Sequence, residues 1–223
     1  MSTFVLVPGA GGVAWYWHRV VARLEAAGRS AVAVDLPGAD PSAGLREYAD
    51  LVVSAAAGRG EVELVAQSLG AFAALAACDR LALRRLVLVN AMIPAPGETP
   101  GEWWDATGWD AARVAAARAS GYAESFDLDT YFLHDVPPEV AAAGAGEQRP
   151  EADVAFGQPC AFERWPDVPT TVLAGRDDRF FPPAFQRRVA RERLGLATRE
   201  LPGGHLIALS RPDALAGALL APA

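Results

Sequence analysis

Residues 61–78 read as a short buried strand that runs directly into a buried helix. The first part, 61–66, is rich in β-branched and apolar residues, which is typical of a strand in a parallel sheet. Nearly every residue from 69 to 78 is Ala, Leu or Phe, which suits a buried helix. This stretch therefore predicts a strand followed by a helix, joined through a turn that contains Ser68.

Similar apolar runs alternate with helical stretches along most of the chain. We expect further strands at 4–7, 31–34, 86–90, 170–174 and 197–201, and further helices at 16–27, 45–57, from about 182, and at 212–220. This alternation requires right-handed βαβ crossovers and a sheet covered by helices on both faces. The predicted fold class is α/β, with a mostly parallel sheet of about six strands.

The alternation breaks once, between about residues 91 and 168, where no strand is evident. Short helical patterns there carry many aromatic residues, and stretches marked by proline frame the entry and the exit. A helical insertion at this point would lie over the carboxyl-terminal edge of the sheet, where open α/β sheets bind ligands. We therefore expect one domain over residues 1–223, with a helical cap at about 91–168.

The composition excludes several kinds of chemistry. All 20 basic side chains are arginine, so the chain can form no lysine Schiff base, hold no pyridoxal phosphate and build no P-loop. His18, His134 and His205 are the only histidines, and a three-histidine zinc site would consume all of them. A net charge of −7 gives no basic footprint for nucleic acid or an anionic membrane. We expect no cofactor and no metal, and a small molecule as the partner.

Nothing in the sequence predicts a membrane span or a secretory signal, because no apolar run is long enough. Cys78 and Cys160 have neither the spacing of metal ligands nor that of a disulfide framework, so we expect a cytoplasmic protein. Monomer and homodimer both stay open.

Ser68 is the candidate nucleophile. It lies in the segment AQSLG at 66–70, one residue away from the G-x-S-x-G pattern, in which small residues let a strained turn lift the serine above the sheet. Its hydroxyl needs a base within hydrogen-bond reach. His205 lies on a glycine-rich loop after the last expected strand, whereas His18 lies in an expected helix and His134 in the expected cap. His205 is therefore the predicted base.

Two aspartates follow the fifth expected strand at the same edge of the sheet. We favour Asp178 as the acid that orients the histidine, because it lies farther out on the loop and can turn back towards it. Asp177 stays an alternative, and either residue could instead cap a helix or a turn.

Two backbone N–H groups are candidates for an oxyanion hole. Leu69 begins the helix after the serine, where the helix dipole supports negative charge. Ala10 lies in the glycine-rich loop after the first expected strand, directly after Pro8 and Gly9, and proline has no N–H to offer. This loop could instead hold a phosphate, but its spacing is not G-x-G-x-x-G.

Taken together, these motifs resemble the α/β-hydrolase superfamily over essentially the whole chain. The resemblance is closest to the compact group of plant methylesterases, hydroxynitrile lyases and small bacterial hydrolases. The matching segments are LVPGA at 6–10 with Trp15 and Trp17 beyond it, DLPG at 35–38, AQSLG at 66–70, GRDD at 175–178, and GH at 204–205 followed by LSRP at 209–212. The order Ser68, Asp178, His205 is also that of the family.

The chain departs from the family pattern at three positions. Pro8 stands where histidine is usual, Ala66 where glycine is usual, and Gln67 where histidine is common. The chain also starts at what corresponds to the family's third strand, which is why we expect about six strands.

The resemblance implies hydrolysis of a small, largely apolar carboxylic ester, thioester or lactone through an acyl-Ser68 intermediate. Hydroxynitrile lyases of this group use a lysine beside the catalytic histidine, but Leu206 follows His205 here, which disfavours cyanogenic lyase chemistry. Two alternatives stay open: a lyase or proton-transfer enzyme that uses the same three residues without an acyl intermediate, and a non-catalytic small-ligand binder on the same fold.

Overall fold

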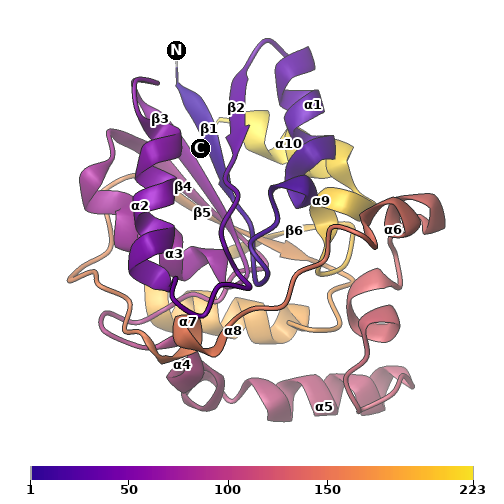
Figure 1. Cartoon of the computed structure of the whole chain (residues 1–223). Coiled ribbons are helices and arrows are strands. Elements are labelled where there is room, and N and C mark those ends of the chain that lie inside the picture. Colours follow the sequence, from indigo (N-terminus) through magenta and orange to yellow (C-terminus); the bar gives the residue numbers. More distant parts are fainter. Residues whose placement is uncertain (1, 223) are drawn as a thin grey trace.

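A six-stranded parallel sheet forms the centre of the computed structural model, which describes residues 2–222 (Figure 1). The strand order is β2-β1-β3-β4-β5-β6, and every neighbouring pair is parallel. The strands are β1 (Thr3–Val7), β2 (Ser30–Ala33), β3 (Val62–Gln67), β4 (Leu83–Val89), β5 (Thr170–Gly175) and β6 (Thr198–Leu201). The predicted α/β fold with a six-stranded parallel sheet is confirmed.

The central strands are buried on both faces, which explains their continuous apolar runs. All residues of β1 and β3 are buried. Within β3, Leu64 and Ala66 pack into the core on one face of the sheet, and Val65 packs into the core on the other. The sheet therefore separates two hydrophobic cores.

Helices cover each of these cores. On one face lie α2 (Leu45–Ala56), α3 (Gly70–Ala77) and α8 (Pro183–Leu194), and on the other lie α1 (His18–Ala26), α9 (Ile207–Ser210) and α10 (Pro212–Leu220). The helix expected at 16–27 is preceded by a 3-10 turn, η1 (Ala14–Trp17), and α3 ends in a second one, η2 (Cys78–Arg80). The first of these turns, η1, places Trp17 in the core beneath α1.

The segment between β4 and β5 contains helices and no strand. Its helices are α4 (Pro100–Thr107), α5 (Trp109–Ser120), the π-helical turn η3 (Asp129–Leu133), α6 (Pro138–Gly144) and α7 (Asp153–Gly157). Figure 1 shows α4, α5 and α7 at the end of the sheet to which the strands' carboxyl ends point. Trp103 of α4 is fully buried and donates from Nε1 to the carbonyl of Ile93, four residues beyond β4, which holds α4 against the start of this segment. That the segment acts as a cap stays a prediction.

Candidate active site

Ser68 occupies a strained turn between β3 and α3. Its φ is +49°, and Ser68 and Asn90 are the two non-glycine residues with positive φ among residues 2–222. Such a conformation costs on the order of 1–3 kcal/mol and persists only where the surroundings impose it. A Cβ on Gly70 would lie 2.2 Å from the Pro8 carbonyl oxygen, so this approach of α3 to the loop after β1 requires glycine. Ala66, one of the three departures from the family pattern, is a buried residue of β3 and belongs to the core.

The three side chains predicted as nucleophile, base and acid form one hydrogen-bonded chain. Nε2 of His205 lies 3.3 Å from Oγ of Ser68, and Nδ1 of His205 lies 2.9 Å from Oδ2 of Asp178. All three are buried: Ser68 is 7% exposed, His205 2% and Asp178 3%. Because the three residues follow the parallel strands β3, β5 and β6, the carboxyl ends of those strands bring them to one edge of the sheet.

Asp177 and Asp178 have different contacts. Oδ1 of Asp178 accepts hydrogen bonds from the backbone N–H groups of Phe180 and Phe181, both at 2.8 Å, which leaves Oδ2 facing the histidine. The side chain of Asp177 is 47% exposed and accepts from the N–H of Gly203, at 3.0 Å. Asp177 thus holds the loop before His205, whereas Asp178 contacts the imidazole itself.

Three phenyl rings surround the imidazole of His205. Phe132 stacks on it with a centroid distance of 4.9 Å and an interplanar angle of 16°. Phe180 and Phe181 meet it edge-on at 5.0 Å. These rings restrict its orientation and exclude water from it. Phe180 and Phe181 lie two and three residues after the candidate acid, and this position was the signal by which the sequence could have identified them.

Asn90 ties the histidine loop to the sheet, a role that the sequence analysis missed. Its Nδ2 donates to the carbonyls of Gly204 and His205, both at 3.0 Å, and its Oδ1 accepts from the N–H of Gly175 at 2.6 Å. It is fully buried and has a φ of +44°. A polar residue directly after the buried strand β4, at the edge that carries Ser68, was the available signal.

Gln67 contacts the same histidine nitrogen as Ser68 does. Its Nε2 lies 3.2 Å from Nε2 of His205, and its side chain is buried. The sequence analysis identified Gln67 only as a departure from the family pattern. A polar residue at the end of a buried strand, next to the candidate nucleophile, was the signal.

The two candidate oxyanion donors, Ala10 and Leu69, have N–H groups that donate to no acceptor in the described part of the chain. Leu69 is the N-cap residue of α3, and Ala10 lies within the turn closed by the 3.0 Å hydrogen bond from the Gly12 N–H to the Gly9 carbonyl. Donors of an oxyanion hole must lack an acceptor within the protein, and both N–H groups meet that condition in the described residues; that they form such a hole stays a prediction.

A carboxylate from the helical segment supports the glycine-rich loop. Oε2 of Glu151 accepts from the Gly11 N–H at 2.6 Å, and its Oε1 accepts from the Tyr48 hydroxyl at 2.6 Å. Burial raises the pKa of Glu151, which these hydrogen bonds only partly offset. The residue lies 140 positions from Gly11 along the chain, so no local pattern predicted the contact.

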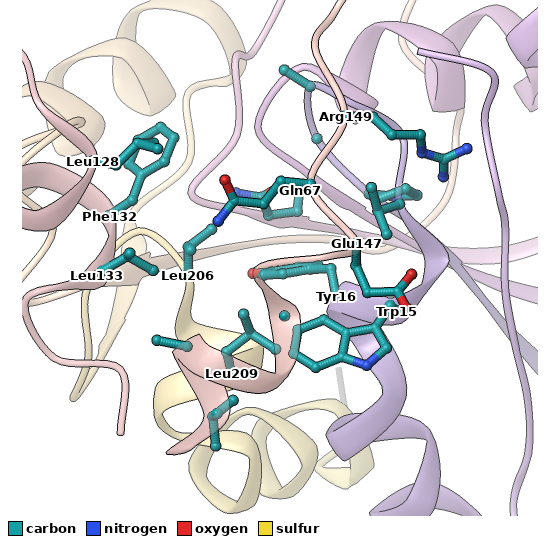
Figure 2. Close-up of a pocket in the computed structure, with 18 residues that line it drawn as sticks. Trp15, Tyr16, Gln67, Leu128, Phe132, Leu133, Glu147, Arg149, Leu206 and Leu209 are labelled. Carbon is teal, nitrogen blue, oxygen red and sulfur yellow. The ribbon is translucent and has the colours of Figure 1, made fainter. Parts of the chain in front are cut away.

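An apolar cavity of about 300 Å³ adjoins the glycine-rich loop (Figure 2). Its lining includes Gly9, Ala10 and Gln67 beside the serine turn. Figure 2 shows Leu128, Phe132 and Leu133 on one side of this cavity, and Glu147 and Arg149 on the other. Its walls come from both the core fold and the segment between β4 and β5.

The remaining histidines and the cysteines lie outside this arrangement. Nδ1 of His18 bonds to the Trp15 carbonyl, and Nε2 of His134 bonds to the Asp177 carbonyl. Cys78 and Cys160 are buried free thiols, and burial raises the pKa of each to about 12. Residues 2–222 contain no group of three or more potential metal ligands, and no helix described there is long and apolar enough to cross a bilayer.

Three features define the α/β-hydrolase class of folds, and this structure has all of them. They are a parallel sheet covered by helices on both faces, a serine on a positive-φ turn after a central strand, and an aspartate and a histidine after later strands. The comparison with protein-family models agrees. The chain belongs to the alpha/beta hydrolase family, whose model matches residues 4–218. The resemblance inferred from the motifs is thereby confirmed.

Individual relatives are esterases and hydrolases. The rice protein Probable esterase PIR7A (Oryza sativa subsp. indica) is 39% identical over 111 residues, a match that spans 44% of this chain and only 42% of the rice protein. The pyrethroid hydrolase of Sphingobium faniae JZ-2 is 25% identical, with a TM-score of 0.77 over 98% of this chain and 95% of that one. The methylesterase MES16 of Arabidopsis is 21% identical, with a TM-score of 0.76 over 99% and 98% of the two chains, a likeness that shows the fold alone.

Proposed function

We propose that this protein is a serine hydrolase that cleaves a small, largely apolar carboxylic ester, thioester or lactone through an acyl-Ser68 intermediate. The observation that carries the proposal is the hydrogen-bonded chain from Ser68 through His205 to Asp178 at the edge of the sheet. The relatives named as esterases and hydrolases support it. The two free thiols favour a reducing compartment, so we place the protein in the cytoplasm.

In this mechanism Oγ of Ser68 attacks the carbonyl carbon while Nε2 of His205 accepts the hydroxyl proton. Asp178 holds the Nδ1–H tautomer and stabilises the imidazolium that forms. The N–H groups of Ala10 and Leu69 bind the oxygen that becomes negative. Collapse of the tetrahedral intermediate breaks the bond to the leaving alcohol or thiol, which takes the proton from Nε2.

The second half of the cycle repeats these steps with water. His205 removes a proton from a water molecule, whose oxygen attacks the acyl carbon, and then returns the proton to Oγ of Ser68. The carboxylic acid leaves and the serine is regenerated. The apolar cavity beside Ala10 and Gln67 supports a substrate with one small apolar group.

The test is hydrolysis of p-nitrophenyl acetate, butyrate and octanoate by the wild type and by Ser68→Ala, with fluorophosphonate labelling of both. We expect turnover and labelling in the wild type and neither in the variant, with the chain-length preference measuring the size of the acyl site. Near-full activity of Ser68→Ala would overturn the mechanism.

Two other outcomes discriminate the alternatives. Labelling of Ser68 without ester turnover in any of the three substrates would favour a lyase or proton-transfer reaction on the same residues. A folded protein that shows neither labelling nor turnover would favour a binding role.

A further inference from the structure

Tyr16 places a buried hydroxyl in the apolar cavity. The residue belongs to η1 and is only 8% exposed. Tyr16 and its neighbour Trp17 both belong to the core beneath α1, but of the two only Tyr16 also lines the cavity. In Figure 2 the Tyr16 ring lies across the pocket, with its hydroxyl directed towards the side of Leu206 and away from Trp15.

Among the described residues, the Tyr16 hydroxyl accepts one hydrogen bond and donates none. Its oxygen accepts a long hydrogen bond, 3.4 Å, from the Ala208 N–H. No acceptor for its own proton is found among the residues that the structure describes. Burial raises the pKa of Tyr16, and the charges of Asp178 and Asp135 raise it further, so the group stays protonated and remains a donor.

The lining side chains beside this hydroxyl offer its proton no acceptor, because the one carboxylate of the lining, Glu147, lies on the side of Arg149 (Figure 2). Leu133, Leu206 and Leu209 are apolar, and Gln67 directs its Nε2, which is a donor, to Nε2 of His205. Arg149 has only donors to offer, and an ion pair with Asp35 at 2.6 Å holds it in place. A purely hydrocarbon ligand would therefore remove water from the Tyr16 O–H and leave its proton unpaired, which is unfavourable.

We propose that Tyr16 is a specificity-determining residue that donates a hydrogen bond to a second oxygen of the substrate, an ether or carbonyl oxygen separate from the scissile carboxyl group. The inference rests on the proposed function, because it concerns the substrate of the same site. It names the substrate class as oxygenated esters of small, otherwise apolar groups. A site built to bond a polar group discriminates against analogues that lack the group.

The test compares isosteric ester pairs that differ by one ether oxygen. On the acyl side these are the p-nitrophenyl esters of methoxyacetate, 3-methoxypropanoate and 4-methoxybutanoate against those of butyrate, pentanoate and hexanoate. On the alcohol side the pair is 2-methoxyethyl acetate against butyl acetate. The quantity measured is the ratio of kcat/KM within each pair, in the wild type and in Tyr16→Phe, so that intrinsic reactivity cancels between the two proteins.

We expect Tyr16→Phe to lower the ether-to-alkyl ratio by about three- to tenfold for at least one pair, the effect of one hydrogen bond. Tyr122→Phe is the matched control, because Tyr122 does not line the cavity, and it should leave every ratio unchanged. The inference is overturned if Tyr16→Phe folds and its ether-to-alkyl ratios of kcat/KM stay within twofold of the wild-type ratios for all pairs.

A binding measurement separates this inference from the proposed function. The experiment is a calorimetric titration, which needs no turnover. The proteins are Ser68→Ala and Ser68→Ala/Tyr16→Phe, and the ligands are methyl 4-methoxybutanoate and methyl hexanoate. Selective weakening of the ether ligand by Tyr16→Phe would support the role of Tyr16 even if the wild type hydrolysed no ester. Equal effects on both ligands, together with unchanged kinetic ratios, would refute it.

Discussion

The side-chain amide of Gln67 and the imidazole of His205 lie 3.2 Å apart, nitrogen to nitrogen, at the atom that also faces Ser68. With Nδ1–H directed to Asp178, Nε2 has a single lone pair to offer. The Gln67 amide and the Ser68 hydroxyl, 3.3 Å away, therefore compete for it. In the free protein the base is shared between the candidate nucleophile and its neighbour.

This competition predicts that Gln67→Met accelerates modification of the serine. Without the competing N–H group, Nε2 is free to accept from Ser68, and one neutral hydrogen bond corresponds to roughly a three- to tenfold change. The measurement is the second-order rate of fluorophosphonate labelling, with melting temperatures to confirm folding. A decrease of more than threefold in a folded variant would show instead that Gln67 holds the imidazole in place.

Replacing each aspartate in turn should distinguish Asp178 from Asp177. Asp178→Asn removes the carboxylate that faces Nδ1, and we expect kcat to fall by about 10³–10⁴-fold, as in serine triads generally. Asp177→Asn alters the contacts with Gly203 and Arg176 but none with the imidazole, so kcat should stay within about threefold. The reverse pattern in p-nitrophenyl butyrate hydrolysis would reassign the acid to Asp177.

Asn90 should contribute strongly to stability. Asn90→Ala leaves the carbonyls of Gly204 and His205 and the N–H of Gly175 without their partner, and we expect a loss of roughly 2–4 kcal/mol in the free energy of unfolding. Asn90→Asp keeps the acceptor for Gly175 but loses both donors. Urea unfolding of both variants measures these losses, and a change below about 1 kcal/mol in Asn90→Ala would contradict this account.

Glu151 should make stability depend on pH in a defined direction. Its pKa is raised by burial above the value of 4.5 for a free side chain, so the folded state binds its proton more tightly than the unfolded state does. This contribution is fully present below about pH 4.5 and is lost as the pH rises through the raised value. We therefore expect the stability of Glu151→Gln relative to the wild type to improve between pH 4 and pH 7.

Urea unfolding at several pH values in that window checks the prediction for Glu151. The control is Glu147→Gln, since Glu147 is an exposed carboxylate four residues earlier in the chain. The quantity compared is the free energy of unfolding of Glu151→Gln minus that of the wild type. The prediction is contradicted if this difference stays constant with pH or changes in the opposite direction.

The two cysteines should be inert in the folded protein. Both thiols are buried, and the pKa of each is raised to about 12, so almost no thiolate exists at pH 8. Ellman's reagent should react with neither Cys78 nor Cys160 in the native state and with both in guanidinium chloride. Rapid reaction of one thiol in the native protein would show that it is accessible.

Much of this protein could be predicted from local sequence. Short apolar runs alternating with helical patterns predicted the six parallel strands. The signal is clearest for the central strands β1 and β3, because a strand buried on both faces is apolar along most of its length, whereas the edge strands β2 and β6 are partly exposed. The segment around Ser68 and the loops of Asp178 and His205 could be assigned to one edge, because parallel strands end on the same side of a sheet.

The tertiary structure alone decided which polar groups meet at that edge. Glu151 reaches the Gly11 N–H across 140 residues, and Phe132 stacks on His205, only because the segment between β4 and β5 folds back over the sheet. The unpaired proton of Tyr16 likewise depends on what surrounds it, including Leu206 and Ala208 near the other end of the chain. Strand and helix patterns are local and follow from side-chain periodicity. Contacts between distant segments follow from packing, which has no periodic signature in the sequence.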